Sequence, residues 1–216
     1  MNLPASVTPD LAPSGRLRAM INLGNPVLAQ GTAEQPRGVT VDIAAAIGAR
    51  LGVPVDLMCV WAAKDAVAAV VAGRADLAFL ANEPARAAYL AFSTPYRVIE
   101  GVYVVPAASG PRSPAEVDVP GVRIGVKEGS AYDLFLTRTL EHASIVRGAD
   151  GVTTFEDLDL EAGAGIRAPV TEFVAARPHL RVIEPAFMAI NQAVATRLEV
   201  APETRAWLDD LVAEFR

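Results

Sequence analysis

Short apolar runs alternate with amphipathic segments along the first hundred residues. Three apolar runs are short enough to be strands, at 17–22, 53–60 and 76–81. Between them, apolar residues recur at helical spacing over 39–52 and 64–73, and these segments end at Gly52 and Gly73, the residue type that closes helices. The order strand, helix, strand, helix, strand predicts a parallel sheet with right-handed crossovers.

A second series of the same kind follows a polar segment. Residues 96–106 are too long for one ordinary strand, and we expect an extended segment that leaves the first sheet. Residues 108–121 are rich in Pro, Gly and Ser, which is typical of a boundary between units. Beyond them we predict strands at 122–126, 143–148, 158–165 and 180–184, with helices from Ser130 to about Glu141 and after Pro169.

The C-terminal segments have no strand of the second series left to continue. We therefore expect the apolar run 186–196 and the helix 202–215 to return to the first unit. The predicted fold is α/β with two lobes, each a mainly parallel sheet flanked by helices, and two chain crossings. Lobe 1 is predicted to hold 1–105 plus 187–216, and lobe 2 to hold 106–186.

Composition limits the chemistry that such a chain can perform. Its 216 residues are 52% hydrophobic and 20% charged, which indicates a globular protein with a large core. The net charge of -6 disfavours nucleic acid or an anionic membrane as the main partner. Single Cys59 excludes an internal disulfide, and His142 and His179 alone offer no zinc-type ligand set, so we expect neither a metal nor a cofactor.

The N-terminal residues contain no basic start followed by an apolar run, and no stretch approaches a membrane span. As the sequence stands, we expect a cytoplasmic protein; if an export signal has been removed, the expected location is the periplasm.

Several segments together resemble a known family. They are RLRAMIN, GVTVDIAAAIGARLGVPVDL, AGRADLAFL, Arg86 six residues before FSTPY, and VRIGVKEGSAYDLFL, in order from about Arg16 to about Thr196. This pattern resembles the type II periplasmic solute-binding proteins of the amino-acid-binding kind, family 3. The resemblance implies two lobes that close on a ligand by hinge motion, a monomer, and an ABC transporter membrane component as partner.

The resemblance assigns Arg86 to the grip on the ligand's carboxylate. A planar guanidinium with five donors suits that task. The alternative is an exposed arginine at the start of a short helix, paired with Glu83. Trp61 falls where the family places an aromatic ring against the ligand, and its alternative is packing in the core.

In the second lobe, Gly129 and Ser130 lie at a predicted junction of strand and helix. Backbone N–H groups at a helix start favour an anion, and the family uses this turn against the same carboxylate. The alternative for Ser130 is a plain N-cap, and both roles are compatible. Tyr132 either lines the cleft or packs under the helix.

Arg167 is the main departure from the family. Aligned on Pro169 and Val170, it takes the place of an aspartate that pairs with the ligand's ammonium group, which a positive charge would repel. With Arg86 it predicts a more anionic ligand, a dicarboxylate or another small organic acid. The alternatives are a misalignment by one residue, or an outward side chain paired with Glu161 or Glu172.

The loop AFLANEPAR is shorter than in relatives and lacks the Gly and Thr with which they bind the ligand. Asn82 is a candidate to replace one of those contacts. Further polar candidates are Ser93, Thr94 and Asn25.

Other functions were weighed against binding. GAGIRA, with Glu184 some twenty residues on, fits a dinucleotide-binding turn, but it falls in the last third of the chain. A dehydratase-like enzyme on this fold would need a cleft acid, for which Glu100 and Glu128 are candidates. A sensory effector-binding role would need a partner protein. The favoured prediction is a non-enzymatic solute-binding protein.

Overall fold

Two compact units make up the chain in this computed structural model, which describes residues 3–108 and 110–216. Unit 1 contains Met1–Arg97 and Asn191–Arg216, and unit 2 contains Val98–Ile190. The C-terminal segment from Asn191 onward therefore belongs to the first unit, whereas residues 186–190 belong to the second. The lobe limits at 105/106 and 186/187 stay a prediction.

Unit 1 is built on three parallel strands in the order β4-β1-β5, with β12 antiparallel to β5 and β6 antiparallel to β12. Ile21 pairs with Cys59, and Ala19 pairs with Leu77. Its elements are α1 (Val7–Leu11), β1 (Leu17–Asn22), β2 (Gln30–Gly31), β3 (Pro36–Arg37), α2 (Val39–Leu51), β4 (Val55–Val60), α3 (Ala63–Val71), β5 (Leu77–Ala81), α4 (Pro84–Ala87), β6 (Leu90–Phe92), most of β12 (Met188–Arg197), α8 (Pro202–Val212) and the turn η2 (Ala213–Phe215).

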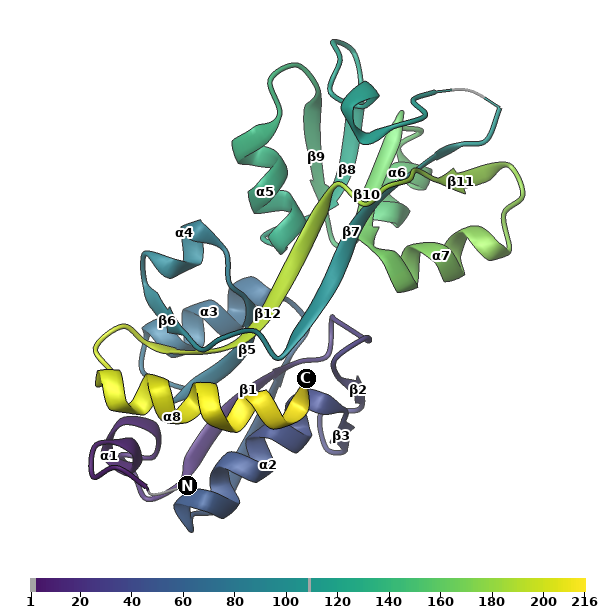
Figure 1. The fold of residues 1–216 in the computed structure, drawn as a ribbon. Helices are drawn as coiled ribbons and strands as arrows, with labels where there is room; N and C mark the ends of the chain where they lie inside the picture. The colour runs from purple at the N-terminus through teal and green to yellow at the C-terminus, as the bar shows by residue number, and fades with distance from the viewer. Residues whose placement is uncertain (1–2, 109) are drawn as a thin grey trace. The chain divides into compact units, whose positions relative to one another are not determined.

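Helices cover both faces of this sheet (Figure 1). Successive side chains of a strand point to opposite faces. Accordingly Leu17, Ala19 and Ile21 share a core with α1, α2 and α8, whereas Met20 of the same strand packs with α3. Because β1 contributes to cores on both faces, Ala19, Met20 and Ile21 form an uninterrupted apolar run in its sequence.

Unit 2 has three parallel strands in the order β9-β8-β10, with β7 antiparallel to β10 and β11 antiparallel to β7. Val102 and Val104 pack with α6 and α7. Tyr103, which points to the other face, stacks on Phe187 with ring centroids 4.3 Å apart. The elements are β7 (Arg97–Pro106), the turn η1 (Pro114–Glu116), β8 (Arg123–Lys127), α5 (Ala131–Thr139), β9 (Ser144–Gly148), α6 (Gly151–Asp157), β10 (Ala162–Ile166), α7 (Arg167–Ala175) and β11 (Leu180–Val182).

The predicted α/β fold class is confirmed, and three details differ. Helix α6 was not predicted; the Asp150 side chain accepts hydrogen bonds from Val152 N at 3.0 Å and Thr153 N at 3.1 Å and so caps its start. The segment 108–121, predicted as a boundary, lies inside unit 2. The GAGIRA glycines lie within β10 and not in a turn at a helix start.

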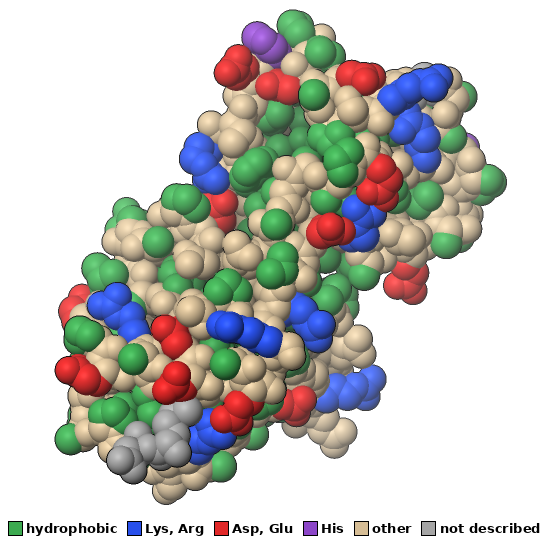
Figure 2. Space-filling model, viewed as in Figure 1, with side chains coloured by type: hydrophobic (Ala, Val, Ile, Leu, Met, Phe, Trp, Pro, Cys, Tyr) green, Lys and Arg blue, Asp and Glu red, His purple; other side chains and the backbone are tan. Residues whose placement is uncertain are grey.

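Figure 2 shows charged side chains of both signs interspersed over the face in view. The net charge of -6 is not gathered there into a single acidic field. Among the described residues no helix is long and apolar enough to cross a membrane.

Glycines let α6 lie directly against the strands of unit 2. A Cβ placed on Gly151 would come 2.0 Å from the carbonyl oxygen of Ala164 and 3.0 Å from that of Gly125. A Cβ on Gly163 would come 2.8 Å from Cβ of Phe155. The backbone of α6 therefore approaches the middle of β8 and β10 more closely than a residue with a side chain would allow.

We expect Gly151→Ala to destabilise unit 2 by at least about 3 kcal/mol, because rigid backbone must move to admit the methyl group. Urea unfolding followed by circular dichroism measures the loss. Gly15→Ala is the control. Position 15 has open space around a Cβ but a φ of 77°, so this variant should lose only about 1 kcal/mol of stability, from holding alanine in the left-handed conformation. Equal losses for the two variants would contradict the close-approach explanation.

Candidate ligand-binding site

The carboxyl ends of the parallel strands gather polar residues at one edge of unit 1. Asn25 follows β1, Trp61 follows β4, and Asn82 and Arg86 follow β5. Ligands of open α/β sheets bind at this edge because loops leave the strands there with unpaired backbone groups. Four predicted residues are thus brought to the same edge by the topology alone.

Arg86 is buried in α4, with 5% of its surface exposed, which excludes the exposed alternative. Its Nη1 donates to the carbonyl oxygen of Ala81 at 3.2 Å. Burial lowers the pKa of the guanidinium to about 10, and the charge of Glu83 opposes that shift. Glu83 is itself buried, so the predicted Glu83 partner lies beside Arg86.

Two buried oxygens of unit 1 lack hydrogen-bond partners within the described part of the chain. They are Oδ1 of Asn25 and the hydroxyl of Tyr96, the last residue of FSTPY. Buried polar atoms are nearly always paired in folded proteins. Burial also raises the pKa of the Tyr96 hydroxyl, so it stays protonated. Asn25 was among the predicted residues, whereas Tyr96 was not.

Trp61 is 63% exposed, so core packing does not explain it. Asn82 is exposed, and its backbone N donates to the carbonyl oxygen of Asn191 at 2.8 Å. Their side chains lie at the edge where a ligand could reach them.

Ser93 and Thr94 hold the framework of unit 1 together. The Ser93 hydroxyl donates to Thr94 O at 2.8 Å and accepts from Val194 N of β12 at 3.0 Å. The Thr94 Oγ1 accepts from Arg216 at 2.5 Å. These contacts tie FSTPY to β12 and to the C-terminus and account for both hydroxyl groups.

Unit 2 presents a comparable edge. Gly129 and Ser130 follow β8, and Arg167 follows the parallel strand β10. Strand β7 runs the other way and pairs Gly101 with Ile166, so Glu100 reaches the same edge.

A carboxylate from within α5 accepts a hydrogen bond from the backbone at the start of this helix. Ser130 Oγ accepts from Asp133 N at 3.1 Å, and Asp133 Oδ2 accepts from Gly129 N at 2.8 Å. This reciprocal arrangement resembles a capping box, except that the Asp133 carboxylate accepts from the residue before the N-cap. Ser130 is therefore the N-cap, and Asp133, which was not predicted, supplies negative charge where an external anion was expected.

Asp133 is only 3% exposed and forms an ion pair with Arg147 at 3.0 Å. Tyr132 is buried beside it, at 5% exposure. Burial raises the pKa of the Tyr132 hydroxyl, and the nearby carboxylate of Asp150 adds to the effect. Tyr132 thus packs in the interior of unit 2.

Arg167 is fully engaged within unit 2. Its Nε donates to Glu100, and its Nη1 and Nη2 donate to the two oxygens of Glu184 at 2.5 and 2.8 Å. These bonds raise the pKa of the Arg167 guanidinium and lower that of the Glu184 carboxyl. The suggested partner Glu161 instead pairs with Arg123 at 2.8 Å, which lowers the pKa of that carboxyl to about 2.

One guanidinium set against two carboxylates leaves the group formed by Glu100, Arg167 and Glu184 with a net charge of -1. Arg167 thus forms ion pairs, as in the second alternative, but with Glu100 and Glu184 as partners. Glu184, considered in the sequence as a dinucleotide contact, serves as an ion-pair partner.

The described residues contain no group of three or more His, Cys, Asp or Glu side chains suited to a metal ion. What the two edges offer is hydrogen-bond donors, one exposed aromatic ring and compensated charges, an arrangement suited to binding a small polar molecule.

Three solved structures that resemble the chain illustrate its similarity to binding proteins. The arginine-binding protein ArgBP of T. maritima, as a P235GK mutant, has a TM-score of 0.76 at 20% identity, covering 96% of this chain and 92% of that one. AbpA of Streptococcus pneumoniae, an amino acid ABC transporter substrate-binding protein bound to L-arginine, has a TM-score of 0.75 at 21% identity, with coverage of 94% and 90%.

A third relative is the ancestral amino acid-binding protein AncCDT-1, described as a precursor of cyclohexadienyl dehydratase. It has a TM-score of 0.75 at 21% identity and covers 97% of this chain and 93% of its own. At these identities the likeness shows a shared fold.

No curated protein sequence matches the chain. The family model of the bacterial extracellular solute-binding proteins, family 3, matches residues 19–215, nearly the whole sequence. The chain therefore belongs to the bacterial extracellular solute-binding proteins of family 3.

Proposed function

We propose that this protein captures a small ligand through one carboxylate, outside the cytoplasm, and presents it unchanged to an ABC transporter. The observation that supports this most is the burial of Arg86 at the carboxyl edge of unit 1. A guanidinium in a dehydrated setting binds a carboxylate through short charge-assisted hydrogen bonds. AbpA, which shares the fold, is described as bound to L-arginine, whose carboxylate fits this proposal.

The charge of the ligand follows from Arg167. The preference for a dicarboxylate depended on two guanidinium groups, Arg86 and Arg167, facing one cleft, and the contacts of Arg167 to Glu100 and Glu184 weigh against it. With a net charge of -1 at that place, a second carboxylate on the ligand gains nothing and an amino group is no longer repelled. The proposed ligand therefore carries one carboxylate, as an amino acid or a small monocarboxylic acid does.

We propose binding without turnover. Glu100 and Glu128, the two candidate acids, are both exposed, and Glu100 is paired with Arg167. A general acid working near neutral pH usually needs burial to raise its pKa. AncCDT-1 is a binding protein by its description, and the fold alone does not assign dehydratase chemistry here.

A screen of amino acids, monocarboxylates and dicarboxylates, each beside its primary amide, tests the proposal. We expect a saturable rise in melting temperature with one class of acid and none with its amide, because the amide lacks the charge that Arg86 binds. NMR of the recovered ligand should show it unchanged. Equal stabilisation by an acid and its amide, or consumption of the acid, would contradict the proposal.

Arg86→Lys separates the geometry of the guanidinium from its charge. The variant keeps the positive charge but loses the planar fork, so we expect Kd for the acid found in the screen to rise by about tenfold or more. Isothermal titration calorimetry measures Kd, and circular dichroism checks that the variant is folded. Arg74→Gln, which removes an exposed charge from the turn after α3, should leave Kd unchanged.

Arg167→Met tests whether Arg167 is structural. Its loss leaves Glu100 and Glu184 without a cation, and we expect a destabilisation of about 1 kcal/mol at pH 7 because the group is partly exposed. The Glu184 pKa is lowered in the folded protein, so this stability is present above the ordinary carboxyl pKa and is lost as pH falls through the lowered value. Urea unfolding at neutral and acid pH measures it. Abolished ligand binding in a variant of unchanged stability would show that Arg167 contacts the ligand.

A further inference from the structure

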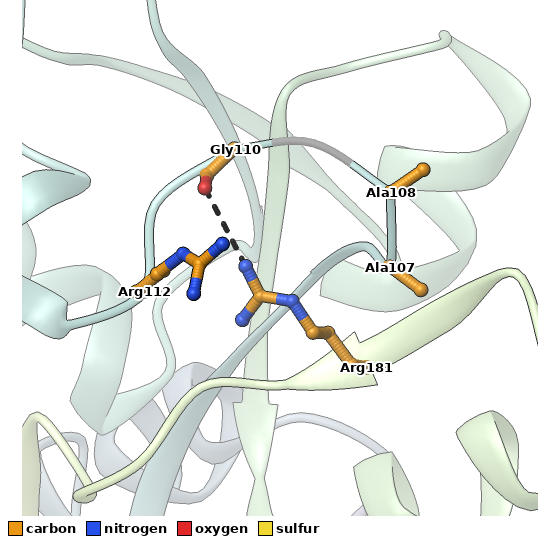
Figure 3. A pocket seen from close by; sticks show the side chains of 5 residues that line it. All are labelled: Ala107, Ala108, Gly110, Arg112 and Arg181. Atoms are coloured by element: carbon orange, nitrogen blue, oxygen red, sulfur yellow. Dashed lines mark hydrogen bonds between the residues drawn. The ribbon is translucent and has the colours of Figure 1, made fainter.

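A hollow on unit 2 brings two arginines together away from the edge described above. Its volume is about 360 Å³, and it is lined by Ala107, Ala108, Gly110, Arg112 and Arg181. Figure 3 shows the side chains of Arg112 and Arg181 pointing toward one another. This volume is in the range of small-molecule sites in proteins.

The hollow lies at the opposite end of the sheet from Arg167. Strand β7 pairs Gly101 with the last residue of β10, Ile166, and ends at Pro106 just before the hollow. Arg181 comes from β11, where it pairs with Val105 near the same end of β7. Five residues of strand correspond to about 17 Å, so a ligand in the hollow does not reach Arg167.

The donors of the two arginines are mostly unused. Arg181 Nη2 donates to the carbonyl oxygens of Pro111 at 2.6 Å and Gly110 at 3.5 Å, which anchors the loop. Within the described part of the chain, the Arg112 guanidinium forms no hydrogen bond or ion pair, while its backbone N donates to Glu116 at 3.0 Å. Each guanidinium has five N–H donors, so several are left for a ligand.

Among the described residues, the carboxylate of Glu116 lies close enough to be influenced by both charges. The pKa of Glu116 is lowered, first by hydrogen bonds from Arg112 N and Ser113 and then by the charges of Arg112 and Arg181. Two positive groups and one negative group give the hollow a net charge of +1, in a chain whose net charge is -6. Like charges that point toward one another repel, and an anion held by both relieves the repulsion.

We propose that this hollow binds a small dianionic oxyanion, of the class of inorganic phosphate, sulfate or a phosphate monoester. Several acceptor oxygens on one compact centre match two guanidinium forks at once. The other described lining residues are Ala and Gly, and none of them carries an aromatic ring on which a nucleobase could stack. The ligand is therefore the oxyanion group itself, and this site is separate from the carboxylate site at Arg86.

Inorganic phosphate, at a pH where it is mainly dianionic, is the probe, with sodium chloride at the same ionic strength as reference. Calorimetry should show saturable phosphate binding that chloride does not reproduce. Arg112→Gln should weaken it by about tenfold, since charge-assisted bonds are lost. Arg112 is the better position to change because Arg181 also anchors the loop.

Two further variants test whether phosphate affinity follows the charge at the hollow. Glu116→Gln removes the opposing negative charge and should tighten phosphate binding severalfold, the reverse of Arg112→Gln. Arg74→Gln removes one positive charge from unit 1 and should leave binding unchanged. The proposal is overturned if chloride acts as phosphate does, if Arg112→Gln and Arg74→Gln weaken binding equally, or if Glu116→Gln weakens it.

Discussion

The alternation of side chains along fully covered strands is the constraint on which the rest of this structure depends. In unit 1, β1 and β5 contribute apolar side chains to cores on both faces of the sheet, so helices cover both faces. The loops after the strands are where most of the candidate polar residues lie. The loops after β1, β4 and β5 accordingly carry Asn25, Trp61 and Arg86 to one edge.

Charge compensation within each unit is the second general feature. Arg86 has Glu83 beside it, Arg167 has Glu100 and Glu184, and the start of α5 has Asp133. Removing charges from water costs several kcal/mol per ion unless an opposite charge accompanies them. Each unit thus places an opposite charge beside its own ions.

The sequence predicts the long, strongly periodic elements well and the short, polar ones poorly. The strands around 17–22 and 77–81 and the helix over 39–51 follow from periodicity and from Gly52 in the left-handed region. Helix α6 is seven residues long and includes two threonines and two acidic residues, so its pattern is weak; only Asp150 in capping position marks its start.

Ion-pair partners were the hardest feature to predict. Arg167 and Glu100 are 67 residues apart, and only the register that pairs Ile166 with Gly101 brings them together. A sequence shows that Arg167 replaces an acid, but it does not show which carboxylates neutralise the arginine. Arg86 could be selected as a candidate from its local flanking segment, whereas the ion pairs of Arg167 depend on contacts across the sheet.

Arg167 also has a mechanical consequence. The chain enters unit 2 at Val98 and leaves it at Ile190; Glu100 lies on the entering segment and Glu184 shortly before the leaving one. One side chain therefore cross-links the incoming and outgoing segments without a covalent bond. The electrostatic attraction in such a link weakens as dissolved ions screen the charges. The strength of the non-covalent link between the segments that enter and leave unit 2 therefore depends on salt concentration.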